Sequence, residues 1–203
     1  MRYSVIIHKD PDSDYGVTVP ELPGCFSAGE SIEEALGMAK DAILTHIEGW
    51  RIDGENVSHL KPTVEDVAAY ILENRGLMTA MKLQTLVYYS QAWSLVWDEE
   101  PLFDQRIEAW SFSPVVPALY EIHRGCFKVS EVPGGNSANL SSGQADTIDK
   151  VLEYYGDKSS HWLSELAHQE APWQQARKGL KPGERGAREI TLSAMAEYYS
   201  SLV

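Results

Sequence analysis

The chain has 203 residues, 43% of them hydrophobic, and a formal net charge of −13 at pH 7. Proteins that bind nucleic acids neutralise phosphates with Lys and Arg, so this charge argues against direct nucleic-acid binding and favours a basic protein partner. The cysteines have no metal-binding spacing, the N-terminal segment has no apolar signal core, and no stretch reaches the roughly 20 apolar residues of a membrane span, so we expect a soluble, cytoplasmic protein without a membrane partner.

The first 30 residues carry a strand pattern. Apolar residues alternate with others over residues 3–7 and again over residues 15–19, and a turn rich in Asp separates the two segments. Alternation around a turn is typical of a β-hairpin. A third short strand is expected at residues 26–28, after the bend that Pro23 and Gly24 impose.

A helix is predicted from residue 31 to residue 48. Ser31 and Glu34 have the spacing of a capping box, in which the hydroxyl and the carboxylate accept hydrogen bonds from free backbone N–H groups. Apolar residues recur behind them at helical spacing. One face of this helix can therefore cover the small sheet.

The β-β-β-α order, the PELPGC segment at residues 20–25 and the SIEEA segment at residues 31–35 resemble the N-terminal domain of HicB-type antitoxins. The resemblance covers about residues 1–58. It implies a small, partial RNase-H-like domain that blocks a HicA-type toxin, a small basic RNase, by covering its active surface. HicB-type antitoxins usually continue into a DNA-binding domain, but this chain continues differently, so the resemblance does not extend to operator binding.

After a short linker at residues 59–62, the chain reads as helical. Thr63 is expected to cap a helix that runs to about Asn74, and Gly76 is expected to end it. Thr79 is expected to cap a longer helix that is apolar on most sides, as is typical of a helix at the centre of a bundle.

Further helices are expected at residues 143–156, 160–169 and 191–202, and residues 115–124 are compatible with another. Residues 133–142 are rich in Gly, Ser and Asn and are expected to form a mobile loop. The predicted fold class is therefore α+β, with a small β-β-β-α domain followed by a mostly α-helical domain.

Several sequence blocks of the helical part keep the order of a known family. They are VAAYIL at residues 67–72, MKLQTLVYY at 81–89, PLF at 101–103, EAW at 108–110, PVVP at 114–117 and LSELAHQE at 163–170, with Pro172 and Trp173 behind them. These blocks resemble the Panacea family, also described as SocA-like or phage GepA-like, over residues 63–203. The resemblance implies an antitoxin domain that binds and neutralises a toxin.

The resemblance also implies an alternative consequence of toxin binding. One Panacea relative acts as an adaptor that delivers its toxin to an ATP-dependent protease. Two positions of this chain depart from the family pattern, because Ser113 stands where Gly is usual and Ala167 where Thr is usual. The local backbone and capping at these two motifs can therefore differ from the family.

Aromatic residues beside Pro-containing segments are candidates for a toxin-binding surface, because large aromatic side chains are enriched in interface hot spots. Trp110 and Trp173 lie in such segments, whereas Trp93, Trp97 and Trp162 are expected in the core. The full set of candidate toxin-binding residues is Trp110, Phe112, Pro114, Val115, Trp173, Tyr88, Glu21 and Phe26.

Three side chains offer an alternative chemistry. His161, Glu165 and His168 would share one helix face, where two imidazoles and a carboxylate are suitable ligands for zinc. The H-E-x-x-H pattern of zinc proteases does not occur there, so we favour a polar helix face and expect no metal, no cofactor and no catalytic residue. A basic run is interpreted as a solvated loop rather than as a nucleic-acid site: Lys178, Lys181, Arg185 and Arg188.

These patterns predict an antitoxin of a bacterial or phage toxin–antitoxin system. It would neutralise a cognate toxin, encoded in the adjacent gene, by direct protein–protein binding and not by enzymatic catalysis. Two alternatives stay open: a proteolytic adaptor that delivers its partner to an ATP-dependent protease, and a phage-associated enzyme that uses the His/Glu helix face. Assembly into a homo-oligomer is also open.

Overall fold

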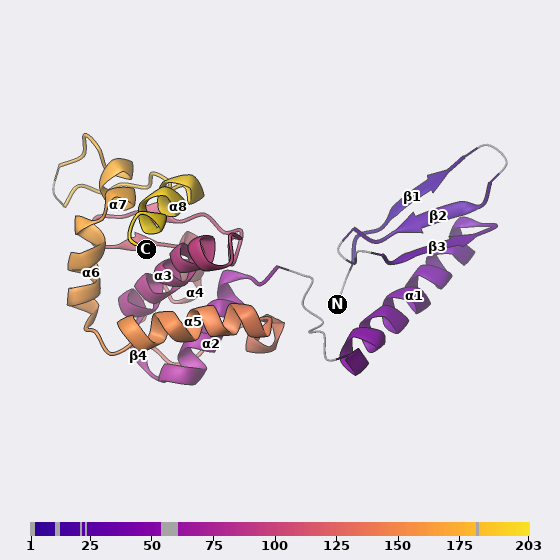
Figure 1. Cartoon of the computed structure of the whole chain (residues 1–203), viewed down its shortest axis with the longest axis horizontal. Coiled ribbons are helices and arrows are strands. Elements are labelled where there is room, and N and C mark those ends of the chain that lie inside the picture. The colour runs from indigo at the N-terminus through magenta and orange to yellow at the C-terminus, as the bar shows by residue number, and fades with distance from the viewer. Residues whose placement is uncertain (1–2, 11–12, 21, 23, 54–60, 182) are drawn as a thin grey trace. The chain divides into compact units, whose positions relative to one another are not determined.

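The structure, a computed structural model, describes residues 3–10, 13–20, 22, 24–53, 61–181 and 183–203. The chain divides into two compact units, residues 1–60 and 61–203, and each is described here by itself (Figure 1). The α+β class is confirmed, because a three-stranded sheet with one helix precedes a mostly helical region. Of the predicted linker, residues 59 and 60 lie outside the described residues.

The first unit is an antiparallel sheet with a helix on one face. Its elements are β1 (Ile6–Lys9), β2 (Tyr15–Thr18), β3 (Phe26–Gly29) and α1 (Ile32–Asp53), and the strand order is β1-β2-β3. Val17 of β2 is buried against Ala35 and Ala39 of α1, since alternate residues of a strand point to opposite faces. The predicted β-β-β-α order is confirmed. The helix continues to Asp53 rather than ending at residue 48, because Gly49 weakens a helix without breaking it.

The junction between β3 and α1 is tight. The Ser31 hydroxyl accepts a hydrogen bond from the Glu34 N–H at 3.2 Å, as the predicted capping box requires. The Glu34 carboxylate accepts from the N–H of Glu30 at 3.0 Å, one residue earlier than in the standard box. A Cβ on Gly29 would lie 2.6 Å from the backbone nitrogen of Ala35, so glycine is what allows this close approach.

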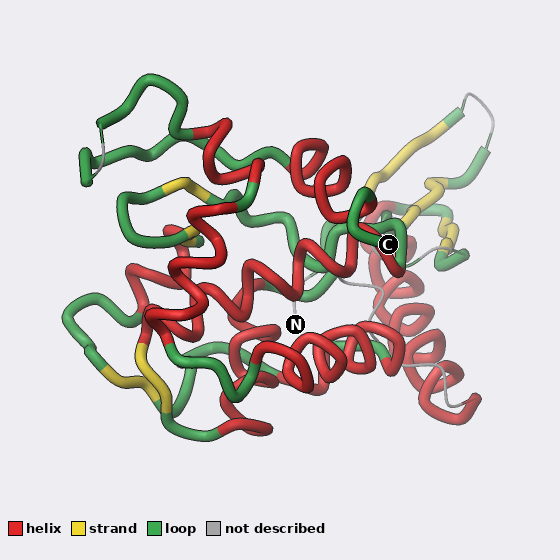
Figure 2. Tube along the Cα trace, turned by 60° about the vertical axis from the view of Figure 1, so that its left-hand side comes forward, coloured by secondary structure: helices red, strands yellow, loops and turns green. Residues whose placement is uncertain are grey.

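The second unit is a helical bundle to which two short two-stranded sheets and one 3₁₀ helix are added. Its elements are α2 (Val64–Arg75), β4 (Met78–Thr79), α3 (Ala80–Trp97), β5 (Glu108–Ala109), β6 (Pro114–Val115), α4 (Pro117–Ile122), β7 (Lys128–Val129), the 3₁₀ helix η1 (Ser137–Asn139), α5 (Ser142–Tyr155), α6 (Ser160–Gln169), α7 (Ala171–Ala176) and α8 (Leu192–Ser200). Strand β4 pairs with β7, and β5 pairs with β6 (Figure 2). Helix α3 packs against α2, α5, α6 and α8, so it is central, as its apolar sequence predicts.

Two buried glutamines of α3 hold extended segments against the helix. The amide of Gln91 donates to the carbonyl of Phe103 at 3.0 Å and accepts from its N–H at 3.1 Å. Gln84 makes the same pair of bonds to Val116, at 3.4 and 2.8 Å. Each glutamine therefore replaces the hydrogen bonds that a neighbouring strand would supply, which satisfies backbone groups in the interior.

Residues 133–142, predicted to be a mobile loop, are fastened to α2 instead. The carboxylate of Asp66, which is 3% exposed, accepts from the N–H of Asn136 at 2.8 Å and from the side-chain amide of Asn139 at 3.1 Å. It also accepts from the N–H of Thr63 at 2.9 Å, which completes the cap of α2. These contacts could not be predicted from the sequence, because composition does not reveal a distant buried acceptor.

Replacing Asp66 by alanine is expected to lower the free energy of unfolding of the helical unit by about 2 kcal/mol, because several donors lose a buried acceptor. Urea unfolding followed by tryptophan fluorescence measures this, since five of the six tryptophans lie in this unit. The matched control is Asp66→Asn, which keeps the size and one acceptor oxygen and should lose less. A loss below about 0.5 kcal/mol for the alanine variant would show that the loop is held by other contacts.

Candidate functional site

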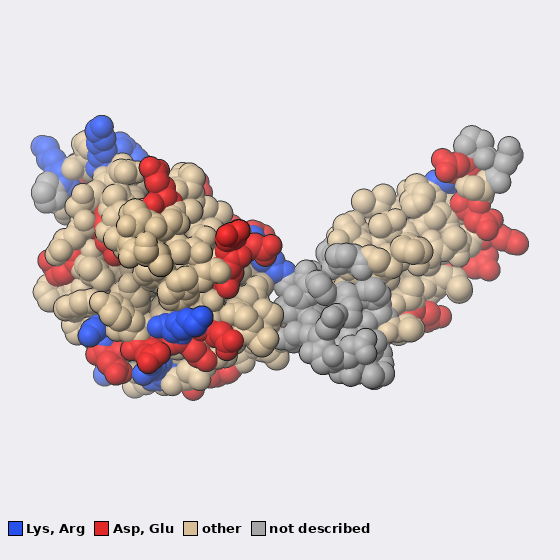
Figure 3. Space-filling model, in the orientation of Figure 1, with Lys and Arg blue, Asp and Glu red and all other residues tan. Residues whose placement is uncertain are grey.

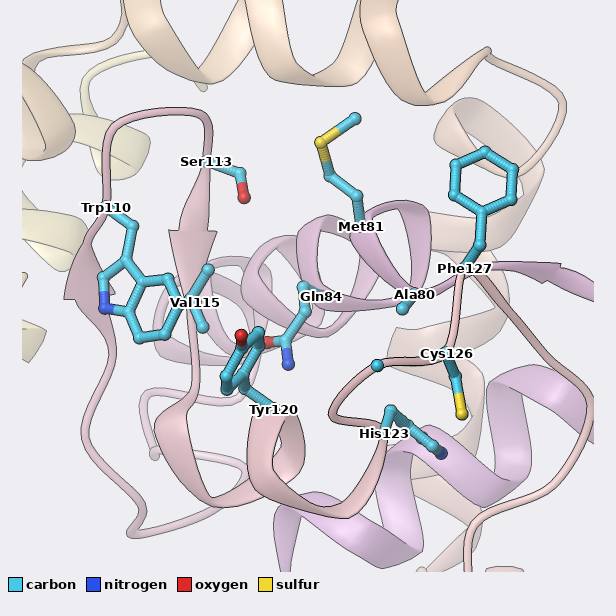
Figure 4. A pocket seen from close by; sticks show the side chains of 11 residues that line it. Ala80, Met81, Gln84, Trp110, Ser113, Val115, Tyr120, His123, Cys126 and Phe127 are labelled. Atoms are coloured by element: carbon cyan, nitrogen blue, oxygen red, sulfur yellow. The ribbon is translucent and has the colours of Figure 1, made fainter. Parts of the chain in front are cut away.

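An open groove of 420 Å³ lies on the surface of the helical unit. Ala80, Met81 and Gln84 of α3 line it from one element (Figure 4). The remaining lining residues come from the β5–β6 hairpin, from α4 and from the turn before β7: Trp110, Ser113, Val115, Tyr120, His123, Gly125, Cys126 and Phe127. Two stretches that are distant in sequence, residues 80–84 and 110–127, therefore build one hollow of the size that encloses compact ligands, about 300–1,000 Å³.

The polar groups at the base of the groove are already hydrogen bonded within the unit. Both amide atoms of Gln84 bind the backbone of Val116. A ring nitrogen of His123, Nε2, lies 3.0 Å from the carbonyl oxygen of Glu131. Because these groups have partners, the base of the groove favours an apolar occupant over a charged one.

Aromatic side chains form one wall and the rim. Trp110 and Tyr120 meet edge to face with ring centroids 4.7 Å apart, a favourable arrangement for aromatic pairs. The indole N–H of Trp110 donates to the carboxylate of the buried Glu108 at 2.8 Å, which fixes the ring. Phe127 is 78% exposed and Met81 is 36% exposed, so the rim presents apolar surface to solvent.

The hairpin that carries Trp110 is held from behind by α6 and α7. The indole N–H of Trp173 donates to the carbonyl of Trp110 at 3.1 Å, and the Arg177 guanidinium donates to that of Ala109 at 2.9 Å. The same guanidinium lies over the Trp173 ring, 5.0 Å from its centroid. The Ser164 hydroxyl donates to the carbonyl of Phe112. These contacts position the hairpin on a rigid support, as a binding surface requires.

Beneath this support lies a buried carboxyl group surrounded by tyrosines. Glu170, which is 4% exposed, accepts hydrogen bonds from the hydroxyls of Tyr199 at 2.7 Å and Tyr89 at 3.2 Å. The hydroxyl oxygens of Tyr199 and Tyr88 lie 3.2 Å apart. Burial raises the pKa of Glu170 to about 7, and the two hydroxyl donors act in the opposite direction. Sequence reasoning missed this cluster, although Glu170 and the tyrosine pair fall within the recognised blocks.

The structure brings some of the predicted toxin-binding residues together in the groove and removes one from the surface. Trp110 and Val115 line the groove, and Pro114 is buried beside Val115 in the same strand. Phe112 is 69% exposed on the hairpin turn. Tyr88 is fully buried in the core against Tyr199, so its prediction as a surface contact was wrong: the central position of α3 leaves that face without solvent.

Two predicted site residues belong to the first unit, and one lies elsewhere in the second. Phe26 is 73% exposed on β3, whereas Glu21 lies outside the described residues. Trp173 is half-buried behind the hairpin rather than in the groove. Sequence reasoning did not single out Phe127, Met81 or Tyr120 as contacts. The signal for Phe127 was an isolated aromatic residue in a short loop between Gly125 and the charged Lys128.

The tryptophans differ from expectation in two cases. Trp97 and Trp162, both predicted in the core, are each 40% exposed, whereas Trp93 is half-buried. Trp97 lies in the last turn of α3 and stacks on Trp93 at 4.7 Å between centroids. Lysine ammonium groups lie over both exposed rings, 5.4 Å from each centroid. Cation–π contact allows these large rings to remain at the surface.

The sheet face of the first unit that lies away from α1 is also partly apolar. Ile6 and Phe26 flank Thr18 in one row across the three strands, and Ile6 is 57% exposed. Figure 3 shows acidic side chains gathered at one end of this unit. The acids that precede and follow the strand ends there are Asp10, Asp14, Glu30, Glu33 and Glu34. These acids adjoin the row of Lys9, Tyr15 and Gly29, whereas the apolar row lies at the other end of the strands. The acidic end is complementary to a basic protein surface.

The His/Glu face of α6 offers little to a metal. His168 Nδ1 lies 3.9 Å from a Glu165 oxygen, and the His168 ring packs on Trp173 with centroids 4.3 Å apart. Burial lowers the pKa of His168. Within the described ranges, no group of three or more His, Cys, Asp or Glu side chains could hold a metal ion, and no helix is long and apolar enough to cross a membrane.

Family models of known proteins match residues in both units. The family model for the HicB-like antitoxin of bacterial toxin–antitoxin systems matches residues 3–84, and the model for the antitoxin SocA-like, Panacea domain matches residues 83–174. A UPF0150 protein of Thermoplasma acidophilum is 47% identical over 57 residues, which are 28% of this chain and 83% of that protein. The chain belongs to the HicB-like antitoxin family. Its helical unit carries the SocA-like Panacea domain.

The HicB-like match reaches relatives of different lengths. An uncharacterised 14.9 kDa protein of Haemophilus phage HP1 is 47% identical over 62 residues, which are 30% of this chain and 46% of that protein. Antitoxin HicB of Escherichia coli K12 is 36% identical over 55 residues, 27% of this chain and 40% of HicB. The chain therefore spans less than half the length of these two relatives. No solved structure matches it.

The compact units and the matched ranges do not end at the same residue. The HicB-like match continues through α2 to the start of α3, whereas the first compact unit ends at residue 60. We use the compact units to define the domains, because each has its own core. Residues 1–60 are called the HicB-like domain and residues 61–203 the Panacea domain.

Proposed function

We propose that the chain is an antitoxin that neutralises a cognate toxin by direct protein–protein contact, with the groove of the Panacea domain as part of the contact surface. The observation that carries the proposal is the groove, an open hollow of 420 Å³. The polar groups at its base are hydrogen bonded within the domain, and its rim is apolar. Burial of a partner's apolar side chains there would supply binding energy. The matches of both domains to antitoxin families support this function.

The charge of the chain favours a basic toxin. Residues 1–60 hold 4 basic and 11 acidic side chains, and residues 61–203 hold 13 and 19, so the net charges are −7 and −6. Opposite charge steers association over roughly a Debye length, about 8 Å at physiological salt, and disfavours wrong partners. We place the toxin gene next to the gene of this chain and the complex in the cytoplasm.

Inhibition by this route requires no reaction. A specific interface of about 1,200–2,000 Å² would cover the toxin's working surface sterically. The HicB-like domain would add a second contact through the apolar row of Ile6, Thr18 and Phe26, with the acidic residues at the other end of the sheet attracting a basic partner. Family membership in both domains supports a regulatory role without enzymatic activity.

Co-expression with the protein from the adjacent reading frame tests the proposal. We expect the full chain to restore growth and to co-purify with that protein while leaving its half-life unchanged. A toxin half-life that shortens only in the presence of the chain would favour a proteolytic adaptor. A harmless neighbour that does not co-purify would contradict the proposal.

A double variant separates binding from the enzyme hypothesis. His161 and Glu165 are exposed on α6, so replacing both by alanine removes two of the three candidate metal ligands without opening the core. The antitoxin proposal predicts full protection by this variant. Loss of protection with an unchanged melting temperature would favour the enzyme.

A further inference from the structure

We infer that the groove takes one large apolar side chain from an extended segment of the toxin, and that the Ser113 hydroxyl hydrogen bonds to the backbone of that segment. The inference rests on the proposed function and names the feature of the toxin that the Panacea domain would recognise. It is carried by a hydroxyl that lines the groove and that has no hydrogen-bond partner among the described residues of the domain.

Ser113 is the polar group that points to a ligand. Only 3% of the residue is exposed, and its side chain points into the groove (Figure 4). In the part of the chain that the structure describes, its hydroxyl has no hydrogen-bond partner, whereas Gln84 and His123 at the base of the groove are both engaged. Because Ser113 lines the groove, its hydroxyl is open to the groove and available to bond to a ligand group.

The remaining surface of the groove selects an apolar anchor. Trp110 and Tyr120 offer ring edges and faces on one wall, and Met81 and Phe127 offer flexible and aromatic carbon at the rim. A charged side chain would lose its hydration there without gaining a partner at the satisfied base. Phe, Tyr, Trp, Leu or Met of the toxin would instead bury most of its surface.

The surface around the groove fits a polypeptide better than a small molecule. Phe112, at 69% exposed, lies on the hairpin turn between β5 and β6, and Phe127, at 78%, lies at the rim on the turn before β7. A toxin segment that crosses from one turn to the other would cover both rings. The rings would then exclude water from the central anchor, as residues around an interface hot spot do. The net charge of −6 on residues 61–203 favours basic residues beside that anchor.

The thiol of Cys126 gives a chemical test in the intact protein. Cys126 is exposed and lines the groove, whereas Cys25, the other cysteine of the chain, is buried in the HicB-like domain, where burial raises its thiol pKa. N-phenylmaleimide should therefore add selectively to Cys126 and fill the groove with a phenyl ring. Intact-mass and peptide mass spectrometry confirm the single adduct before binding is measured.

Calorimetric titration with the purified toxin is expected to show at least about 30-fold weaker binding by the modified chain, the size of an interface hot spot. The Cys126→Ser variant treated with the same reagent should bind like the untreated chain. Ser113→Ala should weaken binding about two- to tenfold, the effect of one lost hydrogen bond. Tyr154→Ser, a control on α5 whose side chain is 64% exposed outside the groove, should bind normally.

Two negative results have different meanings. If the modified chain binds within about twofold of the untreated chain, the groove inference is overturned and the antitoxin proposal stands. If the untreated chain does not bind the toxin, the proposed function fails and the inference fails with it. Equal binding by the Ser113→Ala variant and the unmodified chain would remove the hydroxyl from the inference even if the adduct blocks binding.

Discussion

Replacing Glu170 by alanine is expected to lower the free energy of unfolding of the Panacea domain by about 3 kcal/mol, the largest loss predicted for any single change here. The hydroxyls of Tyr89 and Tyr199 would lose their shared acceptor, and a cavity would remain between α3, α7 and α8. A buried donor left without a partner costs far more than an average hydrogen bond contributes. Urea unfolding at pH 7 measures the loss.

The matched control is Glu170→Gln, which keeps the volume and one acceptor oxygen. We expect this variant to lose about 1 kcal/mol or less, and Tyr199→Phe to lose an intermediate amount because one donor and one polar contact to Tyr88 disappear. Equal stability of the alanine and glutamine variants would mean that the tyrosines find other partners, and the cluster would then not hold the core.

Stability of the Panacea domain is also expected to fall as pH rises from about 4.5 through about 7. In this range the folded protein keeps the Glu170 proton, because burial raises the pKa of this carboxyl from 4.5 to about 7, while the unfolded chain has lost it. The unfolded state therefore binds fewer protons, and the free energy of unfolding decreases with pH. The contribution of Glu170 is fully present below the unfolded value and is lost above about pH 7.

The difference between the wild-type chain and Glu170→Gln isolates this effect from all other titrations. Between pH 5 and pH 8 the wild type should lose about 2 kcal/mol relative to the glutamine variant, as follows from the two pKa values. Urea unfolding at four pH values measures the slope. Parallel stability curves for the two proteins would show that the folded pKa of Glu170 is close to its ordinary value.

Helix starts could be predicted from the sequence because their chemistry is local. Thr63 and Thr79 each accept a hydrogen bond from a backbone N–H three residues ahead, and Gly76 ends α2 with positive φ, as predicted. The α-helix α7 escaped prediction and begins beside Pro172. Proline there was interpreted as a break, although it is equally suited to the first turn of a helix.

The groove could be predicted only in part. Trp110 and Val115 were found through their motifs, whereas Phe127 at the opposite rim lies in another segment. The strands that bring these segments together have only two residues each, which is too short to show the alternation of apolar and polar residues that predicts a strand. Tyr88 was wrongly predicted at the surface. The sequence of an apolar helix does not show whether a tyrosine hydroxyl faces a partner protein or a buried tyrosine.

The central claim is that the chain inhibits by occupying its toxin, and titration of the purified toxin's activity with the purified chain tests this most directly. The account predicts that inhibition saturates at a fixed molar ratio without ATP or protease, that the toxin keeps its intact mass, and that denaturing and refolding the complex returns active toxin. Inhibition by far less than a stoichiometric amount of the chain, or a toxin recovered chemically altered, would contradict the account.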